Sequence, residues 1–437
     1  MNKKNYHADL IDIFDAGLKK VHAGHCIKKT CRLADNILTV SDKRFDLDLY
    51  THIYVTGAGK ATAAMALALE EIMGDRIAEG VVSVKYGHTA DLKYIEIIEA
   101  GHPVPDENGC LAAEKIMTLA RKAKENDLFI CLISGGGSAL MPLPVAGVTL
   151  EDKQALTRGL LACGADIHEI NSLRKQLSLI KGGGLAAAAS PATVITLMIS
   201  DVVGDDPGTI ASGPTVYEQN NGLDISEILQ KYNIESKVNP IVYSHLTNGD
   251  FKSTNDHEQN EKLLNLVIGN SLEALQGAKK EAERLGYNTT ILSSSIEGDT
   301  GEAVRLHAAA SRSVINSGNP LSRPACILSG GETTVVVSGD GLGGRNTEFA
   351  LGMALELIHE KGVYFLSAGT DGTDGPTDAA GAMSDSETVM RAKAGGLNPE
   401  IFLRNNDSYS FFKALGDLVV TGPTDTNVMD LRVLLLV

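Results

Sequence analysis

Several short apolar runs in this chain lead directly into glycine-rich loops. The most pronounced is Phe129–Ile133, which is followed by a serine, three consecutive glycines and a second serine. Similar junctions occur at residues 55–60, 328–332 and 369–375. Glycine lets the backbone turn its N–H groups toward one point, and loops of this kind bind anions. A single glycine loop would be explained as a tight turn, but the set predicts a phosphate-binding cleft assembled from distant segments.

The wider pattern is an alternation of short apolar runs with segments of helical periodicity. Such alternation is typical of βα units and of a largely parallel sheet. In the first half we expect strands at 53–56, 80–84 and 93–99 and a helix at 60–73. In the second half the β-branched run Thr333–Val337 ends at a serine and a glycine, which predicts a hairpin and hence a mixed sheet.

The length of 437 residues indicates two domains, because a single hydrophobic core rarely grows to that size. The candidate boundary is the polar stretch 239–261, which is rich in asparagine and aspartate. We therefore expect an α/β, Rossmann-like N-terminal domain over residues 1–245 with a largely parallel sheet. A second α/β domain with a mixed sheet is expected over residues 246–437.

Composition narrows the class of partner. A net charge of −16 argues against nucleic acid and anionic membranes, and the 5% aromatic content lacks stacking platforms for single strands. The six cysteines show no CxxC spacing and are expected as buried thiols in a reducing compartment. Residues 1–21 are polar and then amphipathic rather than a secretory signal, and the apolar run 193–199 is too short to span a bilayer. We expect a cytoplasmic protein that binds small molecules, with a homodimer left open.

Lys60 follows a glycine-rich turn between a predicted strand and helix. The motif fails the dinucleotide fingerprint, because Thr62 stands at its third glycine and the next strand ends in Lys85 rather than an acid. It also fails the P-loop pattern, because Ala61 follows the lysine. Lys60 nevertheless lies in the first turn of a helix, where the dipole attracts an anion. A solvated surface lysine is the equally weighted alternative.

Four other charged residues have positions that suit phosphate chemistry. Arg174 and Lys181 belong to a basic segment that ends in three glycines, although a basic solvent-facing helix is the ordinary explanation. Asp201 directly follows an apolar strand, where α/β sheets bind ligands, and is a candidate base or metal ligand. Arg345 opens an apolar helix after two glycines, which suits bidentate phosphate recognition outside the core.

The candidate metal ligands are two aspartates of the second half of the chain. Asp371 and Asp374 lie in a glycine-rich loop after the strand 363–366, with a spacing that does not match an EF-hand. A magnesium site made of one or two carboxylates and phosphate oxygens fits them, and which carboxylate would bind is left open. His102 stands in a Gly-His-Pro-Val-Pro segment and is interpreted as structural, because the prolines fix a turn.

Taken together, these segments resemble the class II glycerate kinases, which are glycerate 2-kinases with a C-terminal MOFRL domain. The matches extend over about three quarters of the chain in the family's order. They are VTGAGKA (55–61), AGHPVPDENG (100–109), LISGGGSALMPLP (132–144), LRKQLSLIKGGGLA (173–186), SDVVGDDPGTIASGPT (200–215), SGGETTV (329–335), GLGGRNTEFAL (341–351) and SAGTDGTDGPTDAAGA (367–382). The family often has proline where Val203 stands and a residue with a side chain near Gly184.

The resemblance implies two α/β/α domains, a MOFRL region at about 324–432 and an active site in the interdomain cleft. It also implies Mg²⁺-assisted phosphorylation of D-glycerate by ATP to give 2-phosphoglycerate. Lys60, Asp201 and Arg345 correspond to the residues proposed for catalysis in that family. The residues expected to bind phosphate, nucleotide or substrate are the glycine-loop residues and their neighbours, namely Gly59, Ser134, Gly135, Gly136, Gly137, Ser138, Arg174, Lys181, Gly330, Gly331, Glu332 and Asn346.

Two other functions remain in view. A hydroxypyruvate reductase would act on a related three-carbon acid, but the incomplete dinucleotide fingerprint and the missing ribose-binding acid disfavour it. A non-catalytic sensor of nucleotides or sugar phosphates is disfavoured by the number of separate loops that point to catalysis. The nucleotide preference, the pathway and the tolerance of other 2-hydroxy acids are not predicted.

Overall fold

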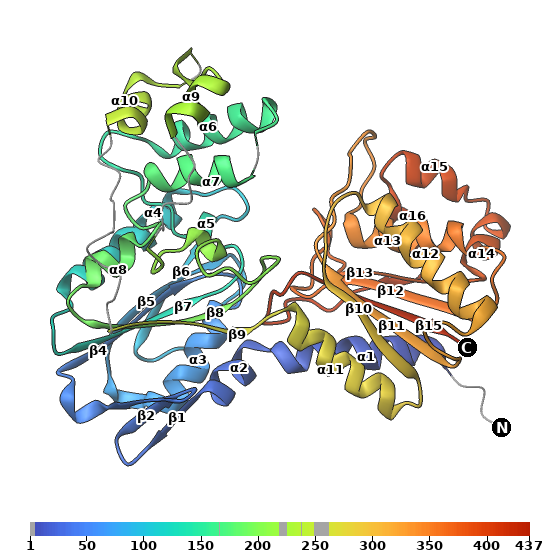
Figure 1. Ribbon diagram of the computed structural model, residues 1–437, viewed down its shortest axis with the longest axis horizontal. Coiled ribbons are helices and arrows are strands. Elements are labelled where there is room, and N and C mark those ends of the chain that lie inside the picture. Colours follow the sequence, from blue (N-terminus) through green and yellow to red (C-terminus); the bar gives the residue numbers. More distant parts are fainter. Residues whose placement is uncertain (1–4, 166, 218–224, 237, 249–261) are drawn as a thin grey trace. The chain divides into compact units, whose positions relative to one another are not determined.

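The computed structural model describes residues 5–165, 167–217, 225–236, 238–248 and 262–437 (Figure 1). The chain forms two compact units, which we call the N-terminal unit (27–199 and 205–268) and the C-terminal unit (1–26, 200–204 and 269–437). This division differs from a single cut after residue 245, because two early segments group with the end of the chain. Part of the predicted boundary, 239–261, forms helix α10 (Pro240–Asn248), and residues 249–261 lie outside the described residues.

The N-terminal unit is built on a six-stranded sheet with the order β6-β5-β4-β7-β8-β9. The pairs from β6 to β8 are parallel, as predicted. Every residue of β7 is buried, which explains its continuous apolar sequence. The strands are β4 (His52–Ala58), β5 (Ile77–Lys85), β6 (Ile95–Ala100), β7 (Asp127–Ile133), β8 (Thr193–Ile199) and β9 (Leu263–Gly269).

Helices pack against this sheet and also form a separate layer. The helices that contact the sheet or one another near it are α3 (Thr62–Met73), α4 (Glu107–Lys122), α5 (Gly137–Leu140) and α8 (Gly184–Ala189). A second group lies together beyond them (Figure 1) and consists of α6 (Leu150–Ala162), α7 (Ile167–Gln176), α9 (Ile225–Lys231) and α10. This second group has a hydrophobic cluster of its own, which includes Leu156, Leu173 and Val242.

A small antiparallel sheet near the start of the chain was not predicted. It consists of β1 (Cys31–Ala34), β2 (Ile37–Val40) and β3 (Lys43–Asp46), and it follows α2 (Ala23–Thr30). Asp35 and Asn36, with φ of 48° and 61°, form the two-residue turn between β1 and β2. Strands of four residues are too short to display a clear alternation, which is why the sequence pattern missed them.

The C-terminal unit is built on a mixed six-stranded sheet, as predicted, with the order β10-β11-β15-β12-β13-β14. Only β10 and β11 are parallel, because the last strand of the chain lies between β11 and β12 and runs antiparallel to both. The strands are β10 (Asn288–Ile296), β11 (Ala325–Gly331), β12 (Val363–Gly369), β13 (Gly381–Asp385), β14 (Leu418–Val419) and β15 (Asp430–Leu436).

The predicted hairpin at Thr333–Val337 is wrong. Thr334 makes only an isolated bridge with Asp299, and Val337 is 74% exposed. The segment is held by a side chain instead: Asn406 donates to the Val336 carbonyl and accepts from the amide of Ser338. Its β-branched residues therefore favour an extended backbone, but no neighbouring strand is available to pair with it.

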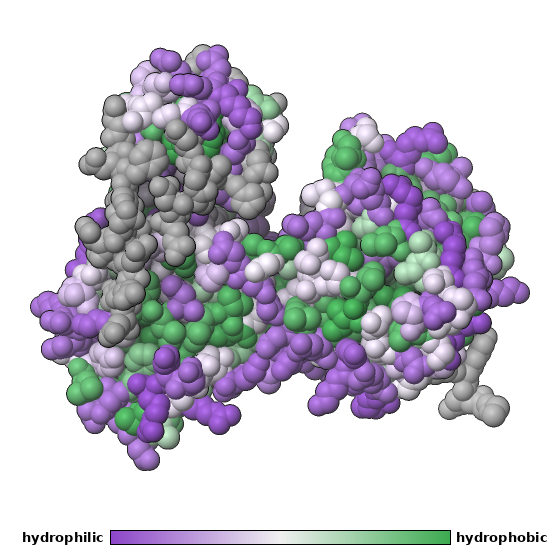
Figure 2. All heavy atoms as spheres, viewed as in Figure 1, coloured by the Kyte–Doolittle hydropathy of each residue, from purple (hydrophilic) through white to green (hydrophobic). Residues whose placement is uncertain are grey.

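Helices cover both faces of this sheet (Figure 1). On one face lie α1 (Tyr6–Val21) and α11 (Ser271–Arg284), and on the other α12 (Thr300–Ser317), α13 (Arg345–Glu356), α14 (Thr388–Ala394), α15 (Pro399–Arg404) and α16 (Ser408–Leu415). Phe349 of α13 stacks on Phe365 of β12 with ring centroids 5.4 Å apart. Hydrophilic side chains predominate on the outside around α15 (Figure 2). None of the described helices has the length and apolarity needed to cross a membrane.

His307 of α12 is a buried histidine whose protonation state follows from its contacts. Its Nδ1 lies 2.7 Å from the Ala303 carbonyl, which can only accept, so Nδ1 carries the proton. Its Nε2 lies 2.7 Å from the Ser329 Oγ and therefore accepts. Burial lowers the pKa of His307 from 6.5 to about 4, and the charge of Arg432 adds to this effect, although the bond to Ala303 opposes it.

The free energy of unfolding is therefore expected to decrease as the pH falls from 6.5 to about 4. In that window the unfolded chain binds a proton that the folded chain excludes, a difference of up to ~3 kcal/mol. Urea denaturation at pH 7.5 and pH 4.5 should show a smaller decrease for His307→Gln than for wild type. The exposed His359→Gln is the control, and equal pH dependence in all three proteins would contradict the assignment.

Candidate active site

The loops that follow β4 and β7 contact each other directly. Gly59 has a φ of +148°, and a Cβ at this position would lie 2.0 Å from the Ser134 Oγ. The Lys60 amide donates to the Gly135 carbonyl at 2.9 Å. Because β4 and β7 are adjacent parallel strands, their carboxyl ends place the two loops at one edge of the sheet. Glycine at position 59 is required for this approach.

The backbone amides at the start of α3 are engaged within the protein. The Gly59 amide donates to the Ser83 carbonyl at 3.1 Å, and the Ala61 amide donates to the Ser134 Oγ at 3.0 Å. Ser134 is fully buried and also shares a hydrogen bond with the Thr62 hydroxyl at 3.1 Å. Gly59 and Ser134, both predicted to bind phosphate or substrate, therefore join the two loops in this structure. The Lys60 side chain is the charged group of this turn.

The second half of the glycine loop is organised differently. Gly136 has a φ of +86° and precedes α5, and the Gly137 amide donates back to the Ser134 carbonyl. Within the described residues, the amides of Gly135 and Gly136 donate no hydrogen bond. Ser138 is tied to Ser212 through a hydroxyl pair at 2.7 Å. The amides at 135 and 136 are therefore the backbone donors of this loop that can bind a ligand.

His102 lies beside this loop, which the sequence interpretation missed. A Cβ on Gly136 would lie 3.0 Å from the His102 Nε2 and 3.5 Å from the Lys60 Cγ, so the imidazole and the lysine flank the same glycine. The available signal was the position of His102 directly after β6, a parallel strand whose carboxyl end lies on the same edge of the sheet as that of β5. His102 is therefore a candidate substrate-binding residue.

Arg174 and Lys181, predicted as anion-binding residues, lie within the same N-terminal unit. Lys181 is 5% exposed and its Nζ donates to the Ser138 carbonyl at 3.0 Å, so its charge borders the glycine loop. Arg174 is half-buried in α7 and donates to the Asn171 Oδ1 at 3.3 Å. Burial lowers the pKa of Arg174, and burial with neighbouring cations lowers that of Lys181 well below its usual value.

Arg345 of α13 is paired with carboxylates in the C-terminal unit. Its Nε and Nη2 donate to the two oxygens of Asp430 at 2.8 and 3.0 Å, and its Nη1 lies 2.7 Å from the Glu332 Oε1. Asp430 is 1% exposed and also accepts from Arg432 at 3.0 Å. Burial lowers the pKa of Arg345, but the charge and hydrogen bond of Asp430, together with the charges of Glu332 and Asp374, outweigh burial and raise it. Arg345 is thus an anchored cation rather than a mobile surface residue.

Asp374 and Asn346 organise the start of α13. Gly344, the N-cap residue, has no side chain, and Asp374 replaces the missing cap by accepting from the amides of Asn346 and Thr347 at 2.9 and 2.8 Å. Asp374 also accepts from the Thr347 hydroxyl, while the Asn346 amide group donates to Asp430 at 2.8 Å. Burial raises the pKa of Asp374, and these hydrogen bonds oppose that effect. Both residues hold Arg345 in place.

The other predicted residues of the C-terminal unit lie at its strand ends. Asp201 belongs to the short segment 200–204 that groups with this unit, and its Oδ2 lies 3.4 Å from the Asn427 Nδ2. Gly331 has a φ of +112°, and a Cβ there would lie 2.3 Å from the backbone of Ile296. A Cβ on Gly330 would meet the Ser271 Oγ at 2.2 Å. These two glycines permit close packing of β11.

The residues present fit a magnesium ion that is held mainly by other ligands. Within the described part of the chain, no group of three or more His, Cys, Asp or Glu side chains could hold a metal ion. Both oxygens of Asp374 accept hydrogen bonds at the start of α13, and the Asp371 Oδ1 accepts from the amide and hydroxyl of Thr373. Magnesium usually takes one or two carboxylates and completes its shell with phosphate oxygens and water. Asp371 and Asp374 are the two carboxylates predicted for this role.

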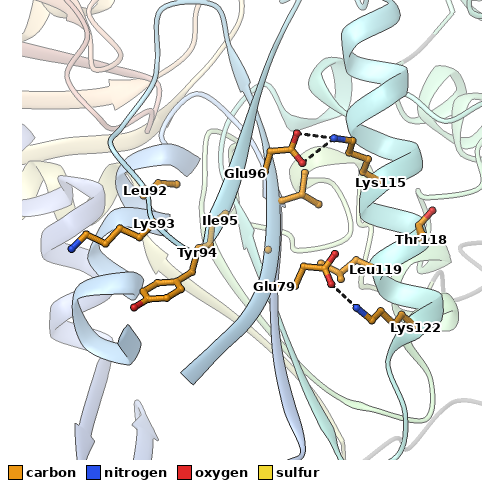
Figure 3. A pocket seen from close by; sticks show the side chains of 12 residues that line it. Glu79, Leu92, Lys93, Tyr94, Ile95, Glu96, Lys115, Thr118, Leu119 and Lys122 are labelled. Atoms are coloured by element: carbon orange, nitrogen blue, oxygen red, sulfur yellow. Dashed lines mark hydrogen bonds and ion pairs between the residues drawn. The ribbon is translucent and has the colours of Figure 1, made fainter. Parts of the chain in front are cut away.

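A described cavity lies elsewhere in the N-terminal unit (Figure 3). It has a volume of about 660 Å³, lies against β5, β6 and α4, and none of the predicted site residues lines it. Two of its three lysines form ion pairs, since Lys115 binds Glu96 at 2.7 Å and Lys122 binds Glu79 at 2.5 Å, and Lys93 is the third. The cavity is therefore separate from the residues predicted to bind phosphate.

Two sequence families match this chain. Residues 9–247 match the family described as a domain of unknown function (DUF4147), and residues 325–430 match the MOFRL family. Together with the α/β/α architecture, these matches define a two-domain protein of the MOFRL class. The chain belongs to the glycerate kinase family of that class, because proteins with this name match it at about 40% identity over nearly their whole length.

Individual relatives carry two kinds of name. The D-glycerate 2-kinase of Thermotoga maritima is 41% identical over 97% of this chain and 100% of its own length. The crystal structure of glycerate kinase from the same organism has a TM-score of 0.86 with 40% identity and covers 99% of both chains. A protein of Agrobacterium vitis with the provisional name hydroxypyruvate reductase is 44% identical over 87% of this chain and 98% of its own.

The buried carboxylate of Asp430 is expected to be a major determinant of stability. In Asp430→Asn, Arg345 and Arg432 lose their shared counter-charge, which should cost about 3–5 kcal/mol. Urea denaturation measures this loss. The control is Glu302→Gln, which removes an exposed ion pair with Arg305 and should cost about 1 kcal/mol or less. Equal losses in the two variants would show that Asp430 does not hold the cations.

Proposed function

We propose that this protein is a glycerate 2-kinase, which transfers the γ-phosphoryl group of ATP to the 2-hydroxyl of D-glycerate. The observation that carries the proposal is the match to the D-glycerate 2-kinase of Thermotoga maritima over essentially both whole chains. The match covers 97% of this chain and 100% of that protein. Phosphoryl transfer requires mainly positioning and neutralisation of charge, and the cations of this acidic chain supply both.

The N-terminal unit is proposed to bind anionic groups through the glycine loop. The Lys60 ammonium and the amides of Gly135 and Gly136 lie around one turn, and His102 flanks it. The amides at the start of α3 are consumed by internal hydrogen bonds, so the side chain of Lys60 carries the function of that turn. Its ammonium would balance the negative charge that develops on the transferred phosphoryl group.

The C-terminal unit is proposed to contribute Arg345 and Asp201. Arg345 would bind phosphate oxygens, and its bonds to Asp430 fix the orientation of its planar guanidinium. Asp201 would accept the proton of the 2-hydroxyl or orient that group. We further propose that Mg²⁺ enters with the nucleotide and that Asp371 supplies a carboxylate to it. When bound, the ion would neutralise phosphate charge.

A reductase is the second candidate, because relatives in Agrobacterium vitis carry that provisional name. A nicotinamide dinucleotide would place its pyrophosphate on the amides at the start of α3. Those amides donate instead to Ser83, Gly135 and Ser134. Residue Thr62, at the position of the third glycine, is also bonded to Ser134. These contacts support the kinase over the reductase.

The wild-type protein is expected to convert D-glycerate and ATP with Mg²⁺ to 2-phosphoglycerate. Phosphorus NMR of the product identifies the phosphorylated carbon, and a coupled assay measures ADP. A 3-phosphate product would overturn the position of transfer. Oxidation of NADH or NADPH by hydroxypyruvate, with no consumption of ATP, would overturn the kinase and support the reductase.

Replacement of Lys60 by alanine is expected to lower kcat by about two to four orders of magnitude, the scale of losing one preorganised charge-stabilising group. The melting temperature should change little, because the lysine lies at the surface of the loop rather than in the core. Lys122→Ala removes a lysine that pairs with Glu79 away from the loop and serves as the control. Near-normal turnover of Lys60→Ala would remove this residue from the reaction.

A further inference from the structure

Lys153 joins Arg174 and Lys181 in a group of three cations that the sequence did not reveal. Lys153 lies on α6, Arg174 on α7 and Lys181 in the turn before α8. Lys153 is 8% exposed and Lys181 is 5% exposed. Helices α6 and α7 pack together through a cluster that includes Leu156 and Leu173, which brings Lys153 and Arg174 into one region. Burial and the charge of Arg174 lower the pKa of Lys153, and burial and the charges of Lys153 and Arg174 lower that of Lys181. We call the three cations the basic cluster.

The basic cluster has no acidic partner among the described residues. Lys181 donates to the Ser138 carbonyl and Arg174 to the Asn171 side chain, and both acceptors are neutral. The Lys153 Nζ is buried and makes no hydrogen bond to any described residue. In the C-terminal unit, by contrast, the partly buried Arg345 and the buried Arg432 share Asp430. No carboxylate of the described residues forms an ion pair with the basic cluster.

Such an arrangement is costly in the absence of a ligand. A buried ammonium without a partner loses its hydration and gains nothing in return, and like charges nearby add to the penalty. Burial, followed by the charge of Arg174, lowers the pKa of Lys153 to about 8. The cost is avoided when an anion brings several negative charges into contact with the cluster. The cluster is thus electrostatically complementary to a multiply charged anion.

The cluster lies next to the glycine loop that the proposed kinase uses. The Lys181 ammonium bonds to Ser138, three residues after Gly135 in that loop. On the other side, the Gln154 amide group donates to the Pro105 carbonyl at 3.3 Å, which ties the helix of Lys153 to the segment that contains His102. The basic cluster therefore borders the anion-binding loop within the N-terminal unit.

We propose that Lys153, Arg174 and Lys181 bind the polyphosphate of the nucleotide, an assignment that rests on the proposed kinase function. Charge decides between this group and the acid substrate, because a triphosphate carries at least three negative charges whereas D-glycerate carries one. The side chains also fit, since a guanidinium binds two phosphate oxygens in a fork and ammonium groups act as point charges. Lys153 is the new member of the site, and it supplies the buried charge that lacks a partner.

The test compares wild type with Lys153→Met, which keeps the length of the side chain and removes its charge. Calorimetry with inorganic tripolyphosphate and with a non-hydrolysable ATP analogue should show Kd values about 10- to 100-fold weaker in the variant, the scale of one charge-assisted contact. The KM for D-glycerate should change less than about twofold. The melting temperature of the ligand-free variant should rise, because a buried unpaired charge is gone.

Matched variants separate a binding effect from a structural one. Arg174→Gln changes a half-buried member of the cluster and should weaken the same two ligands. Lys122→Met removes a lysine that is paired with Glu79 and should leave their binding unchanged. A tripolyphosphate Kd in Lys153→Met equal to that of wild type would overturn the proposal. So would a raised KM for D-glycerate with unchanged nucleotide binding, which would assign the cluster to the acid.

Failure of the proposed nucleotide site and failure of the proposed kinase function give different results. A wild-type protein that phosphorylates D-glycerate while Lys153→Met retains full nucleotide affinity keeps the kinase and overturns the site. A wild-type protein that binds tripolyphosphate through Lys153 without phosphorylating D-glycerate supports the anion site and overturns the kinase. Absence of tripolyphosphate binding in wild type overturns the site directly.

Discussion

The close contact between the loops after β4 and β7 is the constraint on which the N-terminal unit depends. Gly59 must lack a side chain because the Ser134 hydroxyl occupies the place where its Cβ would lie. Once the loops are joined, Ser134 binds the amide of Ala61 and the hydroxyl of Thr62, which consumes donors that a dinucleotide site would use. The junction thereby leaves the Lys60 side chain and the second loop as the groups proposed to bind an anion.

The two units differ in whether their buried cations have a carboxylate partner. In the C-terminal unit, Asp430 is shared by Arg345, Arg432 and Asn346, and Asp374 fixes the helix that carries two of them. The two bonds from Arg345 to Asp430 orient its guanidinium, and the pKa of Arg345 is raised, whereas burial lowers the pKa of Arg432 despite the same partner. The basic cluster has no such partner and its pKa values are lowered. The first arrangement suits positioning, and the second suits a ligand that supplies the missing charge.

Much of the fold could be predicted, because apolar periodicity records burial. The largely parallel character of the first sheet and the helix after β4 follow from apolar runs that end at glycine loops. The hairpin at Thr333–Val337 failed because local β-propensity does not specify a partner strand, and Asn406, distant in sequence, holds this segment. The placement of β15 between β11 and β12 could not be predicted for the same reason, because the pairing is long-range and local sequence does not specify the partner strands.

The sequence indicated which glycines and cations lie in the candidate site. It did not indicate which of these residues contact a ligand and which hold the loops together. Glycine, lysine and arginine patterns indicate where anions can bind, yet the pattern is identical for a residue that binds a ligand and one that joins two loops. Ser134 and Asp374 illustrate this, because each directs its polar atoms to backbone amides. Lys153 illustrates the converse: a lysine within an amphipathic helix ordinarily faces solvent, and only tertiary packing buries it beside two other cations. The proposed anion site therefore depends on buried charges that only the tertiary structure brings together.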